Sequence, residues 1–201
     1  MGSRHLPENY VEEGRWGLKQ VTAADMLLAT IFGLSVPTAL LILGSLAGGP
    51  YDADLTISPG TSVTGAVLGV VMGVVLHESA HGACFLAFGG CPRFGFKPWT
   101  RLGPVFYAAA PGSYFTKLQY ATSGLAPAVL LTVMLVVALA LVAEHDLLAA
   151  VVAWALLLNV MGAAGDMLMM RKLVSYPRAT RFEDTGDGFI AYGPANRLEL
   201  R

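Results

Sequence analysis

The sequence predicts an all-α polytopic membrane protein with four transmembrane helices. Hydrophobic residues make up 55% of the 201 residues and charged residues only 13%, which is too apolar for an ordinary soluble domain. Four apolar runs are long enough to cross a bilayer, at residues 23–47, 61–88, 117–143 and 147–174. We therefore expect a single membrane domain over residues 1–201, with polar tails at 1–22 and 175–201.

Short local patterns mark where these helices begin and end. Thr22 followed by Asp25, and Thr116 followed by Gln119, have the form of helix N-caps. Gly89-Gly90 ends the second run, because glycine is a common residue just past a helix. The connector at 144–146 is so short that the third and fourth helices are expected to form an antiparallel hairpin.

Small residues recur along the second run at a fixed interval. Gly65, Gly69, Gly73, His77 and His81 stand four residues apart. Small residues at this spacing let the backbone of a neighbouring helix come close. We expect the two histidines to continue this packed ridge and to face the bundle, not the lipid.

Residues 91–115 differ from the helices on either side. They hold four prolines, and residues 93–97 and 105–107 have the composition of short strands on either side of a turn. We expect a short β-hairpin or loop insert between the second and third helices. Its aromatic side chains are typical of a membrane interface.

The basic residues indicate how the chain is oriented. All 13 Lys and Arg residues lie in the N-terminal tail, in 89–117 or in 171–201, and the loops at 48–60 and 144–146 have none. This positive-inside pattern places both termini and the insert in the cytoplasm. The formal net charge of −1 implies no broad attraction to nucleic acid. The acids of the C-terminal tail are expected to form a solvated surface.

One motif carries the chemistry, His77-Glu78-Ser79-Ala80-His81 in the second helix. Two histidines four apart on a helix project from one face about 6 Å apart, close enough to bind one Zn²⁺. Glu78 is one step around the helix, where it can take a proton from a zinc-activated water. The alternative is that the histidines are interhelical hydrogen-bonders without metal, which would leave Glu78 a buried acid with no role.

A catalytic zinc site needs a third protein ligand, and depth in the membrane selects Asp166. The histidines lie about 24–30 Å along the second helix from its outer end, and Asp166 lies about 28 Å along the fourth. His145 would be a membrane thickness away, and Cys84 lies too far along the same straight helix as the histidines. The alternative for Asp166 is a partner for a basic group, but Arg171 and Lys172 are expected at the interface.

Asn159 shares a helix face with Gly162 and Asp166, which stand at i, i+3 and i+7. A buried amide in a membrane needs a hydrogen-bond partner. Two readings remain open. Asn159 bonds to another helix, or its NH₂ group stabilises the oxyanion that develops on the substrate.

These residues resemble a known family. His77-Glu78-x-x-His81-Gly82, the strand-like insert, Leu125-Ala126-Pro127 and Asn159-x-x-Gly162-x-x-x-Asp166 are similar to the small prokaryotic putative zincin membrane peptidases, relatives of the site-2 protease class of intramembrane zinc metalloproteases. The resemblance implies one zinc per chain, held by His77, His81 and Asp166, with Glu78 as catalytic acid and base. It also implies a multi-pass protein of the prokaryotic cell (inner) membrane. Unlike in the better-known site-2 proteases, Met167 and not glycine follows the aspartate.

The sequence thus predicts an intramembrane zinc metalloprotease that hydrolyses peptide bonds in or next to the bilayer. Its expected partners are membrane lipid and a membrane-protein or peptide substrate. Two alternatives belong to other classes: a non-catalytic zinc-containing scaffold, and a metal-ion transporter. The intact Glu78 argues against the first, and the scarcity of acids in the helices argues against the second.

Overall fold

The computed structural model describes residues 5–46, 59–101 and 103–196. The helical runs expected from the sequence are present, and each described boundary lies within two residues of the expected one. The third run is divided by a π-helical turn, η2, and a short 3₁₀ turn, η1 (Leu18–Gln20), precedes the first. The connector expected at 48–60 lies almost wholly outside the described residues. The helical segments are α1 (Ala23–Leu46), α2 (Pro59–Ala87), α3 (Lys117–Ala126), η2 (Pro127–Leu131), α4 (Thr132–Leu141) and α5 (Asp146–Val174).

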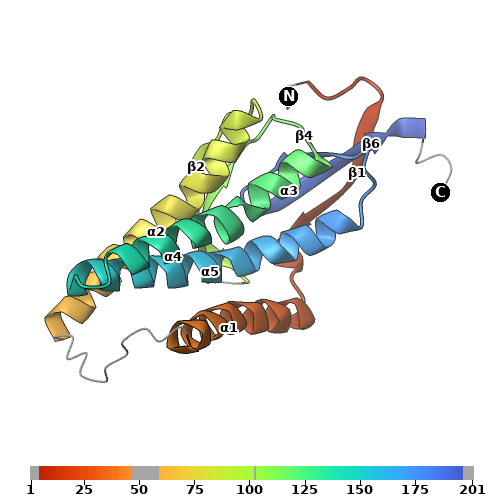
Figure 1. Ribbon diagram of the computed structural model, residues 1–201. Coiled ribbons are helices and arrows are strands. Elements are labelled where there is room, and N and C mark those ends of the chain that lie inside the picture. The colour runs from red at the N-terminus through yellow and green to blue at the C-terminus, as the bar shows by residue number, and fades with distance from the viewer. Residues whose placement is uncertain (1–4, 47–58, 102, 197–201) are drawn as a thin grey trace.

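The all-α fold class is wrong, because the described part of the chain is mixed α/β. Both tails, for which no strands were expected, form antiparallel strands (Figure 1). One sheet has the order β1-β6-β5-β4, and a second pairs β2 with β3. The strands are β1 (Tyr10–Gly17), β2 (Arg93–Thr100), β3 (Gly103–Ala109), β4 (Phe115–Thr116), β5 (Arg181–Asp184) and β6 (Gly188–Pro194).

In the C-terminal tail, buried side chains alternate with partly buried ones along β5. In β5 the inward positions are Phe182 and Asp184, which are buried, while Arg181 and Glu183 are only partly buried. Phe189 and Ala191 of β6 are also buried. This period of two is the pattern of a half-buried strand. The charged residues between the buried ones, Arg181 and Glu183, make the C-terminal tail look polar as a whole.

Several local predictions are confirmed. The insert at 91–115 contains a β-hairpin, in which β2 and β3 pair from Arg93↔Ala109 to Thr100↔Gly103. Thr116 and Gln119 form a reciprocal capping box at the start of α3. Gly89 follows α2 with a φ of 84°, a conformation that suits glycine.

The two faces of α2 have different environments. A Cβ atom at Gly69 would lie 2.5 Å from both Trp154 Cβ and Val151 O of α5, so the glycine ridge is the surface on which α5 packs. Two residues further along, on the opposite face, the valines at 63, 67, 71 and 75 are each more than half exposed. A wide exposed apolar face of this kind suits lipid.

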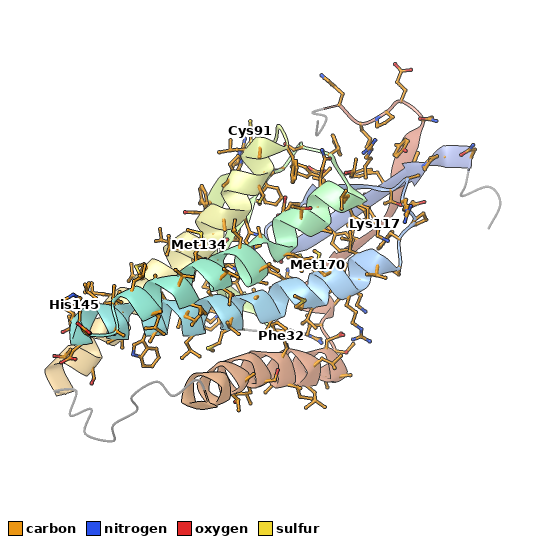
Figure 2. The ribbon with its side chains drawn as sticks, viewed as in Figure 1. Phe32, Cys91, Lys117, Met134, His145 and Met170 are labelled. Carbon is orange, nitrogen blue, oxygen red and sulfur yellow. The ribbon has the colours of Figure 1, made fainter. Side chains whose placement is uncertain are left out.

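Three helical segments among the described residues are long and apolar enough to cross a membrane: Gly60–Ala87, Lys117–Leu141 and Asp146–Val174. This indicates a membrane protein. The described apolar part of α1, Ala23–Ser35, is shorter. Lys117 and His145 lie at opposite ends of the helices (Figure 2), which places His145 far from the strands.

An aromatic core joins the four-stranded sheet to one end of the helices. Phe182 is fully buried, and its ring lies 5.6 Å from that of Tyr120 in α3 and 5.3 Å from that of Phe189 in β6. Leu168 and Leu173 of α5 belong to the same cluster. The strands built by the two tails are therefore packed directly on the helices that carry the candidate site.

Candidate metal centre

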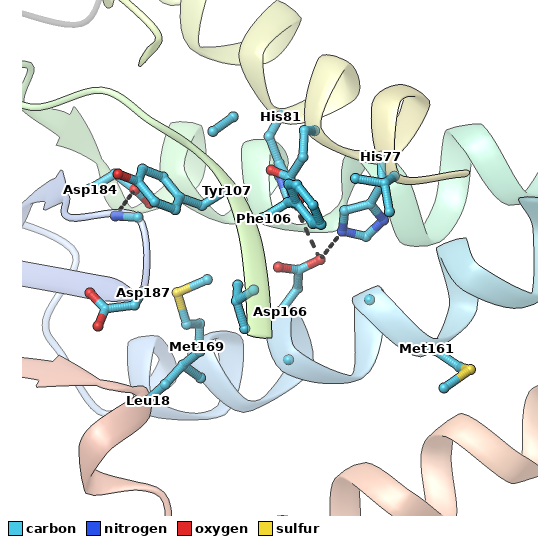
Figure 3. Close-up of a pocket in the computed structure, with 18 of the residues that line it drawn as sticks. Leu18, His77, His81, Phe106, Tyr107, Met161, Asp166, Met169, Asp184 and Asp187 are labelled. Carbon is cyan, nitrogen blue, oxygen red and sulfur yellow. Dashed lines mark hydrogen bonds and ion pairs between the residues drawn. The ribbon is translucent and has the colours of Figure 1, made fainter. Parts of the chain in front are cut away.

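Three potential metal ligands converge in the helical part of the molecule. His77 and His81 project from α2 and Asp166 projects from α5, and one ligand atom of each lies within 4.8 Å of the other two (Figure 3). Their exposed fractions are 6%, 8% and 6%. The structure thus brings together the two histidines of the motif and Asp166, the third ligand that depth along the helices selected.

The arrangement fits a metal ion better than it fits an unmetallated cluster. Asp166 Oδ2 lies 3.3 Å from His77 Nε2 and 3.4 Å from His81 Nε2, yet it is buried without a hydrogen bond. A buried polar atom without a partner is costly, and a metal ion would satisfy it. Two imidazole nitrogens and one carboxylate oxygen are also a donor set that zinc accepts with one position left open.

Both histidine rings are held in place by a hydrogen bond at Nδ1, the ring nitrogen that does not face Asp166. His77 Nδ1 lies 3.0 Å from Asn159 Oδ1, and His81 Nδ1 lies 2.8 Å from the carbonyl oxygen of Ser123. Each Nδ1 therefore donates its proton to an oxygen, which leaves the Nε2 lone pair toward Asp166. A ligating histidine commonly donates its other ring nitrogen in this way.

Glycine at position 162 makes room for one of these rings. A Cβ atom there would lie 2.8 Å from Cε1 of His77. One face of α5 thus carries Asn159, which is a hydrogen-bond partner, Gly162, which leaves space for the His77 ring, and Asp166, which is a candidate ligand. All three serve the histidines of α2.

Glu78 lies at the same cavity as the three ligands. The cavity has a volume of about 270 Å³ and is bounded by α2, α5, α3, β3 and the β5–β6 turn. The backbone of Ala108 in β3 lies within hydrogen-bonding reach of the Glu78 carboxylate. Glu78 thus lies on the wall of the cavity that His77, His81 and Asp166 also line.

Asn159 is fully buried and uses both ends of its amide. Its Nδ2 donates to Pro127 O and to Thr132 Oγ1, each at 2.9 Å, while its Oδ1 accepts from His77. Of the two readings left open by the sequence, these bonds favour the interhelical one.

The other candidate ligands lie elsewhere. Cys84 is outside the cluster, and His145 is at the far end of the helices (Figure 2). Arg171, one of the bases that Asp166 could have paired with, binds Asp25 at the start of α1, with Nη1 2.7 Å from Oδ1. The basic-partner alternative for Asp166 therefore has no support from Arg171.

Part of the cavity wall was not foreseen. Asp184 of β5 is buried and accepts a hydrogen bond of 2.7 Å from Tyr120 Oη, so this acid of the C-terminal tail does not belong to a solvated surface. Both residues line the cavity, as does Leu18. The signal that could have revealed Asp184 is its spacing of two residues from Phe182, which marks the buried face of a strand.

Comparison with known proteins also indicates a zinc site. The family described as "Putative zincin peptidase" matches residues 70–181, which is more than half of the chain and contains all five predicted site residues. No curated protein and no solved structure matches. The family implies zinc, and the cluster of His77, His81 and Asp166 is a set of residues that could hold it. The chain belongs to the putative zincin peptidase family.

Proposed function

We propose that the protein is an intramembrane zinc metalloprotease, related to the site-2 protease class, that cleaves peptide bonds in or next to the bilayer. The observation that carries this proposal is the buried cluster of His77, His81 and Asp166. Its one unpartnered oxygen, Asp166 Oδ2, faces both imidazoles, and Glu78 lies at the same cavity.

Each residue has a distinct part in the proposed reaction. His77, His81 and Asp166 would hold one zinc ion per chain, which would polarise the scissile carbonyl and lower the pKa of water. Glu78 takes the proton of the attacking water and returns it to the nitrogen of the leaving amine. The apolar walls of the cavity limit the water that reaches the reacting groups.

Strand β3 is placed to hold the substrate. It pairs with β2 along one edge, and five consecutive residues of β3, 104–108, line the cavity. A substrate helix must unwind before cleavage, because its carbonyl groups are bound within the helix. The unwound segment could then pair with β3 as an added strand, a common mode of peptide recognition.

The pairing of the tails supports an even number of membrane crossings. β1 and β6 form an antiparallel pair with a register shift between Glu12 and Gly14, which supports placing the segments before α1 and after α5 on the same side of the membrane. With three long apolar helices, an even number requires that α1 also crosses. At 24 residues α1 would span about 36 Å as a helix, which is sufficient. Together with the basic residues, this supports tails on the cytoplasmic side.

The proposal is tested with purified protein and an unfolded generic substrate. Glu78→Gln should keep about one zinc per chain and lose cleavage by a factor of 10² or more, since proton transfer contributes about 10²–10⁴-fold. Glu144→Gln, an exposed acid at the far end of the helices, is the matched control and should cleave as the wild type does. Full activity of Glu78→Gln would refute the mechanism.

The same experiment separates the alternatives. Zinc in the wild type without cleavage of any substrate would favour a scaffold. Uptake of zinc into vesicles that contain the protein, without cleavage of any substrate, would favour a transporter. Asp166→Ala should lose the metal, and stoichiometric zinc in that variant would reject Asp166 as a ligand.

A further inference from the structure

The amide of Asn159 connects three separate segments of the chain. It is on α5, it faces His77 on α2, and it donates to Pro127, the first residue of the η2 turn, and to Thr132, the residue that follows it. With an exposed fraction of 0%, it has no access to water. The two ends of this amide are chemically different, and only one orientation suits His77.

The η2 turn decides which way the amide points. A carbonyl oxygen can only accept, so the amide atom 2.9 Å from Pro127 O has to be the nitrogen. The second N–H is taken by Thr132 Oγ1, also at 2.9 Å. The turn is π-helical, and the backbone N–H of Thr132 donates to the same Pro127 carbonyl. π-Helical turns inside α-helices often occur at functional sites.

The orientation of the amide then sets the form of His77. With its nitrogen committed to the turn, Asn159 presents Oδ1 to His77 Nδ1 at 3.0 Å. An oxygen acceptor requires the proton on Nδ1, so Nε2 keeps its lone pair and faces Asp166 Oδ2 at 3.3 Å. If the amide were flipped, its nitrogen would donate to Nδ1 and the proton would move to Nε2, where no metal could bind.

We propose that Thr132 and the Pro127 carbonyl form an outer positioning pair of the metal centre, acting through Asn159 to keep His77 in its metal-binding form. Thr132 is thus a positioning residue and not a catalytic one. Both amide hydrogens of Asn159 are used for this purpose and do not contact the substrate. The inference rests on the proposed function only in taking His77 as a ligand.

The test measures zinc affinity by competition with a chelator, independently of cleavage. Asn159→Leu, which is similar in size but apolar, should bind zinc about 10–100-fold more weakly, as is typical when the partner of a ligating histidine is removed. Thr132→Val should weaken binding less, by roughly threefold to tenfold, and Thr132→Ser, which keeps the hydroxyl group, should restore the wild-type affinity. Thr30→Val is the control, because Thr30 donates only to Met26 O within α1.

The outcomes separate this inference from the proposed function. Wild-type zinc affinity in Asn159→Leu together with a loss of turnover would mean that the amide stabilises the oxyanion, and would overturn the inference alone. Equal affinity in Thr132→Val and the wild type would remove Thr132 from the chain of contacts, even if Asn159→Leu failed to fold. Absence of zinc from the wild type would instead overturn the proposed function.

Discussion

The helical half and the stranded half of this molecule use polar residues in opposite ways. In α2 and α5 polar side chains are rare, and His77, His81, Asn159 and Asp166 are all buried at one centre. In the described strands polar side chains are common, and Asp184 is the only one that is buried, while the aromatic Phe182 and Phe189 are buried. In α2 and α5 a buried polar residue therefore indicates the candidate metal centre, whereas in the strands a buried aromatic residue indicates the core.

The two halves nevertheless share one core and one cavity. Tyr120 of α3 stacks on Phe182 of β5 and donates to Asp184, and both Tyr120 and Asp184 line the cavity that contains the candidate metal ligands. The sheet made by the tails is thus part of the candidate active site. Three predictions test the packing within and between the two halves, in order of decreasing expected effect.

The largest effect is expected in the shared aromatic core. Phe182→Ala removes a fully buried ring and should lower the free energy of unfolding by about 3–5 kcal/mol. If the halves unfold as one unit, zinc release on heating should shift down together with tyrosine fluorescence. Val11→Ala, at a 40% exposed position of β1, should change little. A lower fluorescence midpoint with unchanged zinc release would show that the halves are independent.

A smaller effect is expected where α2 meets α5. Gly69→Ala would place a Cβ atom 2.5 Å from backbone and side-chain atoms of α5, which forces the helices apart. We expect a loss of about 1–3 kcal/mol in stability, measured by unfolding in detergent. Gly33→Ala is the matched control, because nothing lies within 4 Å of its Cβ position. Equal stability of both variants would contradict the close packing of this ridge.

The smallest effect is a dependence of stability on pH in the stranded half. Burial raises the pKa of Asp184 from its ordinary 3.8 to about 6, although hydrogen bonds from Tyr120 and Gly186 oppose the rise. Below pH 3.8 the carboxyl is protonated in both the folded and the unfolded chain. As the pH rises to about 6 the unfolded chain ionises first, so this contribution to stability is lost across that window.

The matching variant is Asp184→Asn, which cannot ionise. The wild type should lose about 2 kcal/mol of stability between about pH 4 and pH 7 relative to this variant. Thermal unfolding of both proteins across that range measures the difference. Parallel pH profiles would mean that Asp184 ionises normally in the folded protein.

Much of the helical half could be predicted from the sequence. A run of apolar residues long enough for a bilayer has few alternatives to a helix, and depth along two helices was sufficient to pair Asp166 with His77 and His81. The capping boxes and the hairpin at 93–109 were also predictable, because their signals are local.

The four-stranded sheet was not predictable in the same way. It joins Tyr10–Gly17 to Gly188–Pro194, segments separated by almost the whole chain, and no local pattern specifies such a pairing. The burial of Asp184 follows from that sheet and was missed with it. Likewise, the hydrogen bonds of Asn159 depend on a π-helical turn, which Pro127 alone indicates only as a helix irregularity.

The central claim is that two imidazole nitrogens and one carboxylate oxygen bind zinc in the helical half. X-ray absorption at the zinc edge of the purified wild type tests it most directly. We predict one zinc per chain with two nitrogen ligands at about 2.0–2.1 Å and oxygen at about 2.0–2.2 Å. A sulfur ligand at about 2.3 Å, which would implicate Cys84 or Cys91, or protein that takes up no zinc, would contradict the account.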